Sequence, residues 1–132
     1  MLVVDASAAV AALTDAGDRG EWIRGRMAGT KLVAPHLLPA ETANALRRCV
    51  RLGDFAAAAC AAMLADLHAM PLALVGFAPF STRVWELRDT VTPYDAWYVA
   101  TAEQAGVPLL TLDAKLATAP GTTCEFLLPP GS

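Results

Sequence analysis

The sequence predicts an α/β fold: a single domain in which a central, mostly parallel sheet is flanked by helices. Short apolar runs alternate with helical segments along the chain, which is typical of strands joined by crossover helices. The length of 132 residues suits one ordinary domain with one core. No internal repeat, low-complexity tract or long linker divides the sequence, so we expect one domain over residues 1–132.

The first half of the chain alternates two expected strands with three helices. The apolar run Leu2–Val4 is a short buried strand, and the Ala-rich segment behind it favours a helix. Residues 21–27 form a second helix after a loop with two glycines. The run 31–34 is a strand, which ends at a proline because proline cannot donate to a strand ladder. Residues 38–52 place apolar side chains at a helical period, and the glycine that follows ends this helix.

The second half continues the same alternation. Asp54 suits the N-cap of a helix that reaches about Met70, because its carboxylate can accept a hydrogen bond from a first-turn amide. The apolar run 72–77 is a strand, and residues 81–88 form a short helix. The remaining expected elements are a helix that starts at Thr92 and runs to Gln104 before Gly106, a strand over 109–112, a helical turn over 113–117 and a strand over 124–128.

Composition and charge limit the possible functions. The 13 acidic and 10 basic residues give a net charge of −3, which argues against a general polyanion binder but leaves room for a local basic rim. Hydrophobic residues make up 55% of the chain, which predicts an exposed apolar patch and hence a homodimer or a protein partner. Three cysteines without a C-x-x-C pair indicate reduced thiols and a cytoplasmic protein. The sequence lacks a signal peptide pattern and an apolar run of about 18 residues, so we expect no membrane association.

Four acidic residues stand at the ends of expected elements. Asp5 and Asp113 each directly follow a strand and directly precede a helix. Glu41 and Asp95 each lie in the first turn of a helix. An open parallel sheet binds its ligands beyond the carboxyl ends of its strands, so we expect these four side chains to share one edge of the sheet.

Each of these acids also has a purely structural interpretation. Asp5 and Asp113 can be N-caps, worth about 1 kcal/mol each. Asp95 lies three residues after Thr92 and can complete a capping box. Glu41 can respond to the positive end of its helix dipole. Taken one at a time, the acids do not distinguish a site from helix capping.

Taken together, the four acids favour a metal site. Charged residues are 17% of the chain, and the segments around the acids are otherwise nearly uncharged. Carboxylates that converge without cationic partners repel one another, and a divalent cation relieves this repulsion. Oxygen ligands favour Mg²⁺, with Mn²⁺ as a substitute, over Zn²⁺. His36 and His68 share no ligand spacing with each other or with a cysteine, which agrees with this preference.

Three segments carry a resemblance to a known family. VVDASAAVA, PHLLPAETANALRR and TPYDAWYVATAEQAGVPLLTLDAKLA resemble a PIN domain of the VapC type, found in toxin–antitoxin pairs, and the likeness covers nearly the whole chain. The resemblance implies a Mg²⁺-dependent endoribonuclease that acts as the toxin of a type II system. It implies that Asp5, Glu41 and Asp95 bind the metal, and that Asp113 completes the site. It also implies an RNA substrate, a small cognate antitoxin and a homodimer.

Further residues are candidates for supporting roles. Ser7 can hydrogen-bond Asp5, Asn44 lies one helical turn from Glu41, and Thr111 can support Asp113. The candidates for contacts with RNA phosphates, which a solvated surface explains equally well, are Arg47, Arg48, Arg83, Arg88 and Lys115. The tryptophans can stack on unpaired bases, except that Trp97 lies in a helical pattern that favours packing.

Two other classes of function compete with a nuclease. A non-catalytic protein-binding module would use the four acids only as caps, and the high apolar content fits it. A phosphoacceptor receiver domain also binds Mg²⁺ beside strand ends, but it needs a pair of acids after its first strand. Asp5 stands alone there, and Lys115 is already inside a helix start, so we disfavour the receiver.

Overall fold

A five-stranded sheet with the order β3-β2-β1-β4-β5 forms the centre of the computed structural model, which describes residues 1–132. All four neighbouring pairs of strands are parallel, which confirms the predicted fold class. Val3 in the central strand pairs with Val33 on one side and Leu109 on the other. The strands are β1 (Leu2–Val4), β2 (Leu32–Pro35), β3 (Leu72–Val75), β4 (Leu109–Leu110) and β5 (Phe126–Leu127).

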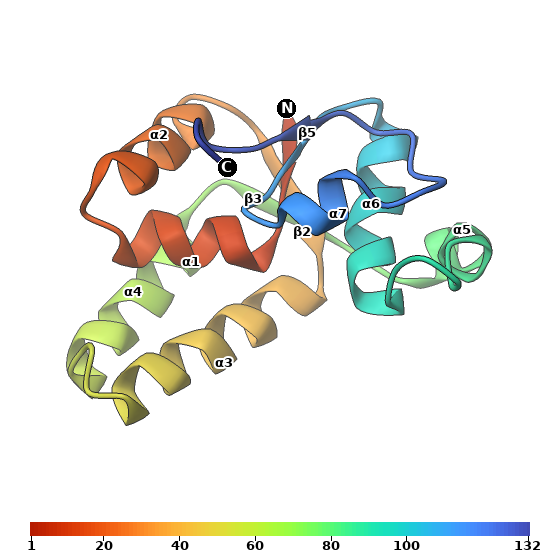
Figure 1. Ribbon diagram of the computed structural model, residues 1–132. Coiled ribbons are helices and arrows are strands. Elements are labelled where there is room, and N and C mark those ends of the chain that lie inside the picture. Colours follow the sequence, from red (N-terminus) through yellow and green to blue (C-terminus); the bar gives the residue numbers. More distant parts are fainter.

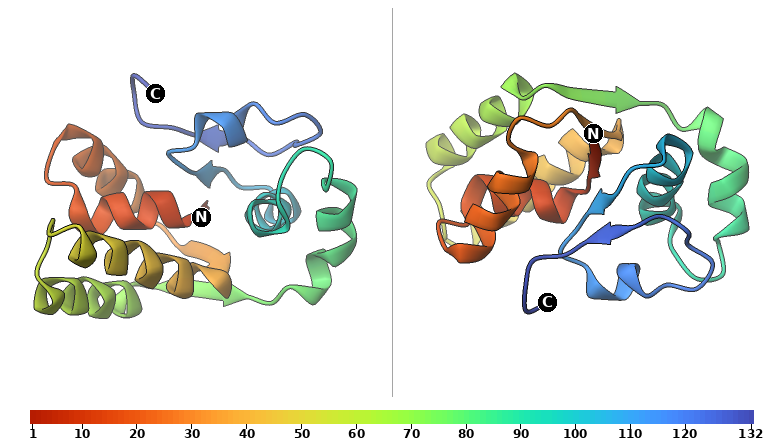
Figure 2. Two further views of the ribbon diagram at one scale, coloured as in Figure 1. Left: turned by 60° about the horizontal axis from the view of Figure 1, so that its bottom comes forward. Right: turned by 90° about the horizontal axis from the view of Figure 1, so that it is seen from above.

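Helices cover both faces of this sheet. Figures 1 and 2 show α1 to α4 on one side and α5 and α6 on the other, with α6 packed against β1, β2 and β4. The helices are α1 (Ala6–Thr14), α2 (Asp18–Met27), α3 (Leu37–Arg51), α4 (Ala57–Ala69), the 3₁₀ helix η1 (Ala78–Phe80), α5 (Ser81–Glu86), α6 (Pro93–Ala105) and α7 (Ala114–Ala117). None of them is long and apolar enough to span a bilayer.

Small side chains explain how α1 packs against the neighbouring helices α2, α3 and α4, and how α6 packs against the sheet. Four alanines of α1 are buried, and three alanines of α6 are buried beside Tyr98 and Val99. An alanine face lets a helix backbone come close to its neighbours while losing no side-chain entropy on folding. Much of the high apolar content is therefore placed inside the molecule.

Several expected elements differ from the structure: α2 begins at Asp18, so Gly20 lies within it, and β3 ends at Val75. Two further differences have a hydrogen-bonding cause. Asp54 does not cap α4, because Ala56 is the N-cap and no side chain bonds there. The Asp54 N–H instead donates to the Cys49 carbonyl (2.9 Å) after Gly53, whose positive φ of 79° closes α3. Strand β4 ends at Leu110 rather than at residue 112, because the Leu112 N–H leaves the ladder and donates to the Ser7 hydroxyl.

The strand order reverses at β1. The chain proceeds from β1 to β2 and β3 on one side of the sheet, then returns to place β4 and β5 on the other side. Such a reversal opens a crevice at the carboxyl ends of the two strands that flank it. Here the crevice lies beyond β1 and β4, where Asp5 and Asp113 follow their strands.

Candidate active site

Asp5 lies at the bottom of this crevice and is 7% exposed. Its Oδ1 accepts hydrogen bonds from the Ser7 hydroxyl (2.6 Å) and the Ala8 N–H (3.0 Å). Its Oδ2 accepts a hydrogen bond from the Thr111 hydroxyl. Asp5 therefore caps α1, as one interpretation of the sequence proposed, and the predicted bond from Ser7 is present. A cap engages only part of a carboxylate, which retains lone pairs for a further partner.

Two hydroxyl groups connect the ends of β1 and β4. Ser7 accepts from the Leu112 N–H (3.0 Å), and Thr111 accepts from the Asp113 N–H (3.0 Å), while both hydroxyls donate to Asp5. The supporting hydroxyl of Thr111 is present, but its partner differs from the suggested one. The side chain of Thr111 donates to Asp5 and contacts only the backbone of Asp113.

Asp113 lies on the exposed rim of the crevice. Its Oδ1 accepts from the N–H groups of Lys115 (3.0 Å) and Leu116 (3.2 Å), so it is the N-cap of α7. No hydrogen bond is made to its second oxygen, which stays available for other contacts.

Asp95 is half-buried in the first turn of α6. Its N–H donates to the Thr92 hydroxyl (3.2 Å), which is one half of the capping box considered from the sequence. Burial raises the pKa of Asp95, and the charge of Asp113 raises it further. Burial also raises the pKa of Asp5; hydrogen bonds from Ser7, Thr111 and the Ala8 N–H oppose this shift, and the charge of Asp95 adds to it. The three aspartates therefore form a row of mutually repelling neighbours.

Glu41 is held by Tyr98, a residue that the sequence analysis did not single out for the site. The Tyr98 hydroxyl donates to Glu41 Oε1 (2.7 Å), although 57 positions separate the two residues. Burial first, and then this hydrogen bond, raise the pKa of Tyr98 well above its usual range, so the hydroxyl keeps its proton. A signal was available, because Tyr98 lies three residues after Asp95 and so on the same face of its helix. Asn44 lines the same pocket as Glu41, but no hydrogen bond joins them.

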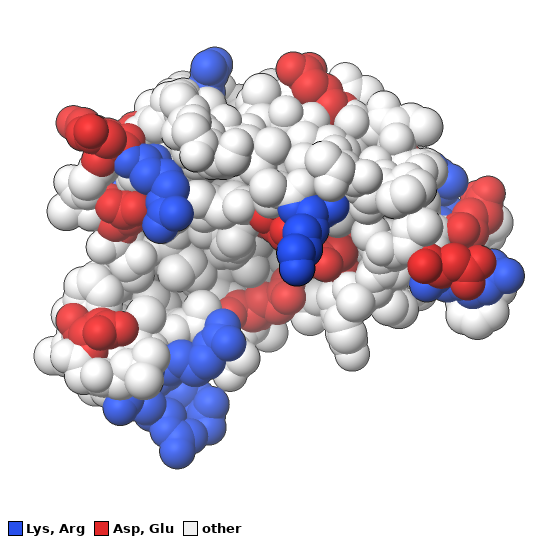
Figure 3. Space-filling view, in the orientation of Figure 1, with Lys and Arg blue, Asp and Glu red and all other residues white.

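The four acids lie along the crevice without pairing with any lysine or arginine. Figure 3 shows acidic atoms in the middle of one face, where α3, α6 and α7 approach one another, and basic atoms that cross them. The ion pairs of the chain lie elsewhere, between Arg19 and Asp15 and between Arg83 and Glu103. The acids are neighbours rather than a closed cage, since no three of the His, Cys, Asp or Glu side chains are close enough to hold a metal ion.

Comparison with known proteins identifies the family of this domain. A family model described as PIN domain matches residues 2–121. The chain belongs to the PIN domain family.

The relatives of this PIN domain share its length as well as its sequence. It is 43% identical to ribonuclease VapC1 of Mycobacterium tuberculosis over 130 residues, 96% of each chain, and 41% identical to ribonuclease VapC3 of the same organism over 118 residues, 89% of this chain and 86% of the relative. Among solved structures, PAE2754 from Pyrobaculum aerophilum has a TM-score of 0.68 at 29% identity, covering 95% of this chain and 81% of the other. Mycobacterium tuberculosis VapC20, described as a sarcin-ricin loop cleaving toxin, has a TM-score of 0.69 at 18% identity, covering 93% and 97%, and shows the shared fold.

Two pockets of the PIN domain flank the row of acids. One, of about 350 Å³, lies between α1 and α3 and is lined by Ser7, Glu41, Asn44 and Arg48 among others. The second, of about 160 Å³, is lined by Asp95, Asp113 and Lys115 among others. The first pocket is thus lined by one acid and one basic side chain, and the second by two acids and one basic side chain.

The other basic candidates divide into two groups. Arg83 donates to both oxygens of Glu103 (2.7 and 3.0 Å) and to the Gly121 carbonyl (2.6 Å), so its donors are engaged inside the fold. Arg83 therefore has a structural role, rather than the contact with RNA phosphate that the sequence suggested. Arg88 stacks on the exposed Trp85 ring (4.8 Å to its centroid). Arg47 is exposed but lines neither pocket.

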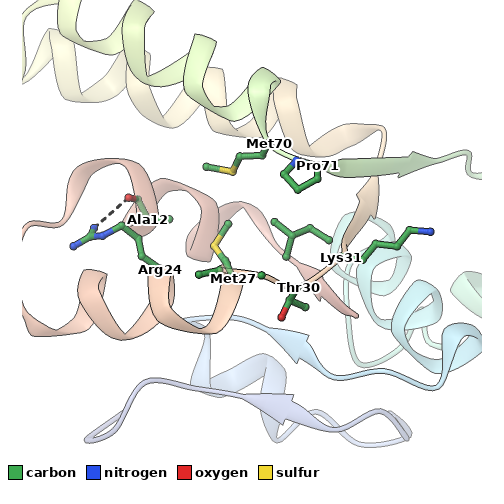
Figure 4. A pocket seen from close by; sticks show the side chains of 10 residues that line it. Ala12, Arg24, Met27, Thr30, Lys31, Met70 and Pro71 are labelled. Atoms are coloured by element: carbon green, nitrogen blue, oxygen red, sulfur yellow. Dashed lines mark hydrogen bonds between the residues drawn. The ribbon is translucent and has the colours of Figure 1, made fainter.

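A larger cavity of about 510 Å³ lies at the opposite edge of the sheet, between α1, α2 and the end of α4. In Figure 4, Met27 and Met70 lie on opposite sides of this cavity and Lys31 extends away from it. Arg24 donates to the carbonyl oxygens of Ala12 (3.2 Å) and Asp15 (2.7 Å), which closes the end of α1. No acid lines this cavity, so it is not a second metal site.

Proposed function

We propose that this PIN domain is a Mg²⁺-dependent endoribonuclease and the toxin of a type II toxin–antitoxin system. The observation that carries the proposal is the buried carboxylate of Asp5 at the reversal point of the sheet, beside Asp95 and without a cationic partner. A buried charge is retained only where something compensates it. The relatives named ribonuclease VapC, at 43% and 41% identity, support RNA as the substrate.

The donor set fits a hard divalent cation. Asp5, Glu41, Asp95 and Asp113 offer only carboxylate oxygens, and His36 lines neither pocket. Oxygen ligands suit Mg²⁺ or Mn²⁺, which keep several water ligands and need only a few carboxylates. When bound, such an ion lowers the pKa of a water molecule and offsets negative charge on the phosphate under attack.

The residues of the chain would then hold the acids in place. Ser7 and Thr111 fix both oxygens of Asp5, so its orientation does not depend on the ion. Tyr98 fixes Glu41 from the opposite helix. Hydrogen-bonding partners of this kind set the orientation and basicity of metal-binding groups. Asn44 makes no hydrogen bond to Glu41. It lines the same pocket, where its amide can contact the substrate.

The proposed toxin role includes protein partners. We infer a small cognate antitoxin from the likeness to VapC ribonucleases, a homodimer from the high apolar content and a cytoplasmic location from the unpaired cysteines. The apolar cavity around Met27 and Met70 and the exposed rings of Trp85 and Tyr94 offer apolar surface for such contacts. Copurification with the protein encoded alongside tests the antitoxin, and sedimentation tests the dimer.

The nuclease proposal is tested by RNA cleavage in the presence and absence of a divalent ion. EDTA should abolish cleavage, and added Mg²⁺ or Mn²⁺ should restore it. Asp95→Asn should abolish cleavage, whereas Asp66→Asn, the same change at an exposed position of α4, should not. Cleavage that survives both EDTA and Asp5→Asn would remove the proposal. A melting temperature that no divalent ion shifts, together with no cleavage, would favour the protein-binding module.

A further inference from the structure

We infer that Arg48 and Lys115 bind the RNA phosphates on the two sides of the scissile one, so that the strand runs from the α1–α3 pocket across the acids to the α7 pocket. This inference rests on the proposed ribonuclease function and adds the path that the RNA strand takes across the site. It selects two of the ten basic residues of the chain for a substrate role.

Helix geometry places Arg48, and not Arg47, beside the acids. An α-helix turns by about 100° per residue, so Arg48 projects about 20° from Glu41 and Arg47 about 120° away from it. The pocket composition agrees, because Glu41, Asn44 and Arg48 line the same cavity and Arg47 does not. Seven residues of helix span about 10 Å, so Arg48 reaches a neighbouring phosphate rather than the one at the acids.

Lys115 occupies the matching position on the other side. The Lys115 N–H donates to the capping carboxylate of Asp113 (3.0 Å), which anchors the backbone of α7 at the rim. Lys115 also lines the pocket of Asp95 and Asp113. Neither Lys115 nor Arg48 forms an ion pair with a carboxylate. Their charges are therefore available to a ligand.

The charge pattern favours a single nucleic acid strand. A row of acids repels phosphate unless a cation intervenes, and the two basic groups at its ends attract phosphate where no cation is needed. One basic side chain at each end and a metal site between them can contact three phosphate-bearing stretches along the backbone of one RNA strand. Figure 3 shows basic atoms gathered over the C-terminal part of α3, the segment that carries Arg48.

The test measures RNA binding without cleavage. In an Asp95→Asn background with Mg²⁺, the affinity for a fluorescent single-stranded RNA of about ten nucleotides and mixed sequence is measured by anisotropy at several salt concentrations. Arg48→Gln and Lys115→Gln should each weaken binding several-fold and lower the slope of log affinity against log salt by about 0.7. Arg47→Gln and Lys31→Gln make the same changes of charge outside the path and should leave both quantities near those of the background protein. Arg48→Lys should restore most of the binding.

The outcomes separate this inference from the proposed function. If the unsubstituted protein cleaves RNA but Arg48→Gln behaves like Arg47→Gln, or Lys115→Gln like Lys31→Gln, the path is wrong and the ribonuclease stands. If the protein neither cleaves nor binds RNA, both fail. A thermal melt of each variant excludes misfolding, which these exposed positions should not cause.

Discussion

Replacing Thr111 by valine should show how much the site depends on one buried hydroxyl. Valine has nearly the same shape, so the change leaves no cavity but removes the donor to Asp5 and the acceptor of the Asp113 N–H. A hydrogen bond to a charged group contributes about 1.5–3 kcal/mol, and an orphaned N–H that water can reach adds little more. We expect the free energy of unfolding to fall by about 3 kcal/mol. At about 2.1 cal/mol/K for each of the 132 residues, this lowers the melting temperature by about 10 °C.

The same change should weaken the metal site. The Thr111 hydroxyl lowers the pKa of Asp5, so its loss raises that pKa further and releases one oxygen from its fixed position. Loss of such a supporting partner typically reduces metal affinity by about tenfold or more. Isothermal titration of the metal-free variants with Mn²⁺ measures this directly.

Thr111→Ser is the matched control for this prediction. Serine keeps the hydroxyl and loses a methyl group, which should lower stability by about 1 kcal/mol and leave metal affinity close to that of the parent. Equal metal affinities for the valine and serine variants would refute the argument that the hydroxyl orients Asp5. A valine variant as stable as the parent would refute the estimate of its hydrogen bond.

Three further predictions concern charged groups and their partners. Because burial raises the pKa of Asp95 above its ordinary 3.8, Asp95 should add stability to the metal-free protein as pH falls through that raised pKa toward 3.8, and Asp95→Asn should reduce the gain by this contribution while that of Asp5 remains, as urea titrations at several pH values would measure. The Glu103 carboxylate binds Arg83 and accepts hydrogen bonds from the N–H and the hydroxyl of Thr123. Glu103→Gln removes its charge and should therefore lower the free energy of unfolding by about 2 kcal/mol in the same assay. Since the pKa of Glu103 is lowered in the fold, its stabilisation is present above its ordinary 4.5 and lost as pH falls, and the loss caused by the substitution should shrink in acid. Tyr98→Phe should weaken Mn²⁺ binding and lower stability by about 1 kcal/mol, whereas Tyr94→Phe on the exposed face should do neither.

Local patterns in the sequence were enough to place the backbone of the site. Asp5 follows an apolar run and precedes an Ala-rich helix, so its position at a strand end required no knowledge of distant residues. The failure at Asp54 has the same local origin, since a good capping residue was present but it belongs to the glycine turn that closes α3, and α4 begins only after Ala56. Propensity identifies which residues can cap, and competition between neighbouring turns decides which one does.

The sequence by itself determined the alternation of strands and helices and the presence of one acid at each of four element ends, because periodicity and capping act over a few residues. Only the tertiary structure decided that Thr111 binds Asp5 and not Asp113, and that Tyr98 reaches Glu41 across 57 positions. It also separated Arg48 from Arg47. These outcomes depend on the order of strands and on the packing of α6 against β1, where contacts between distant segments, rather than any local preference, select the rotamers and partners of each side chain.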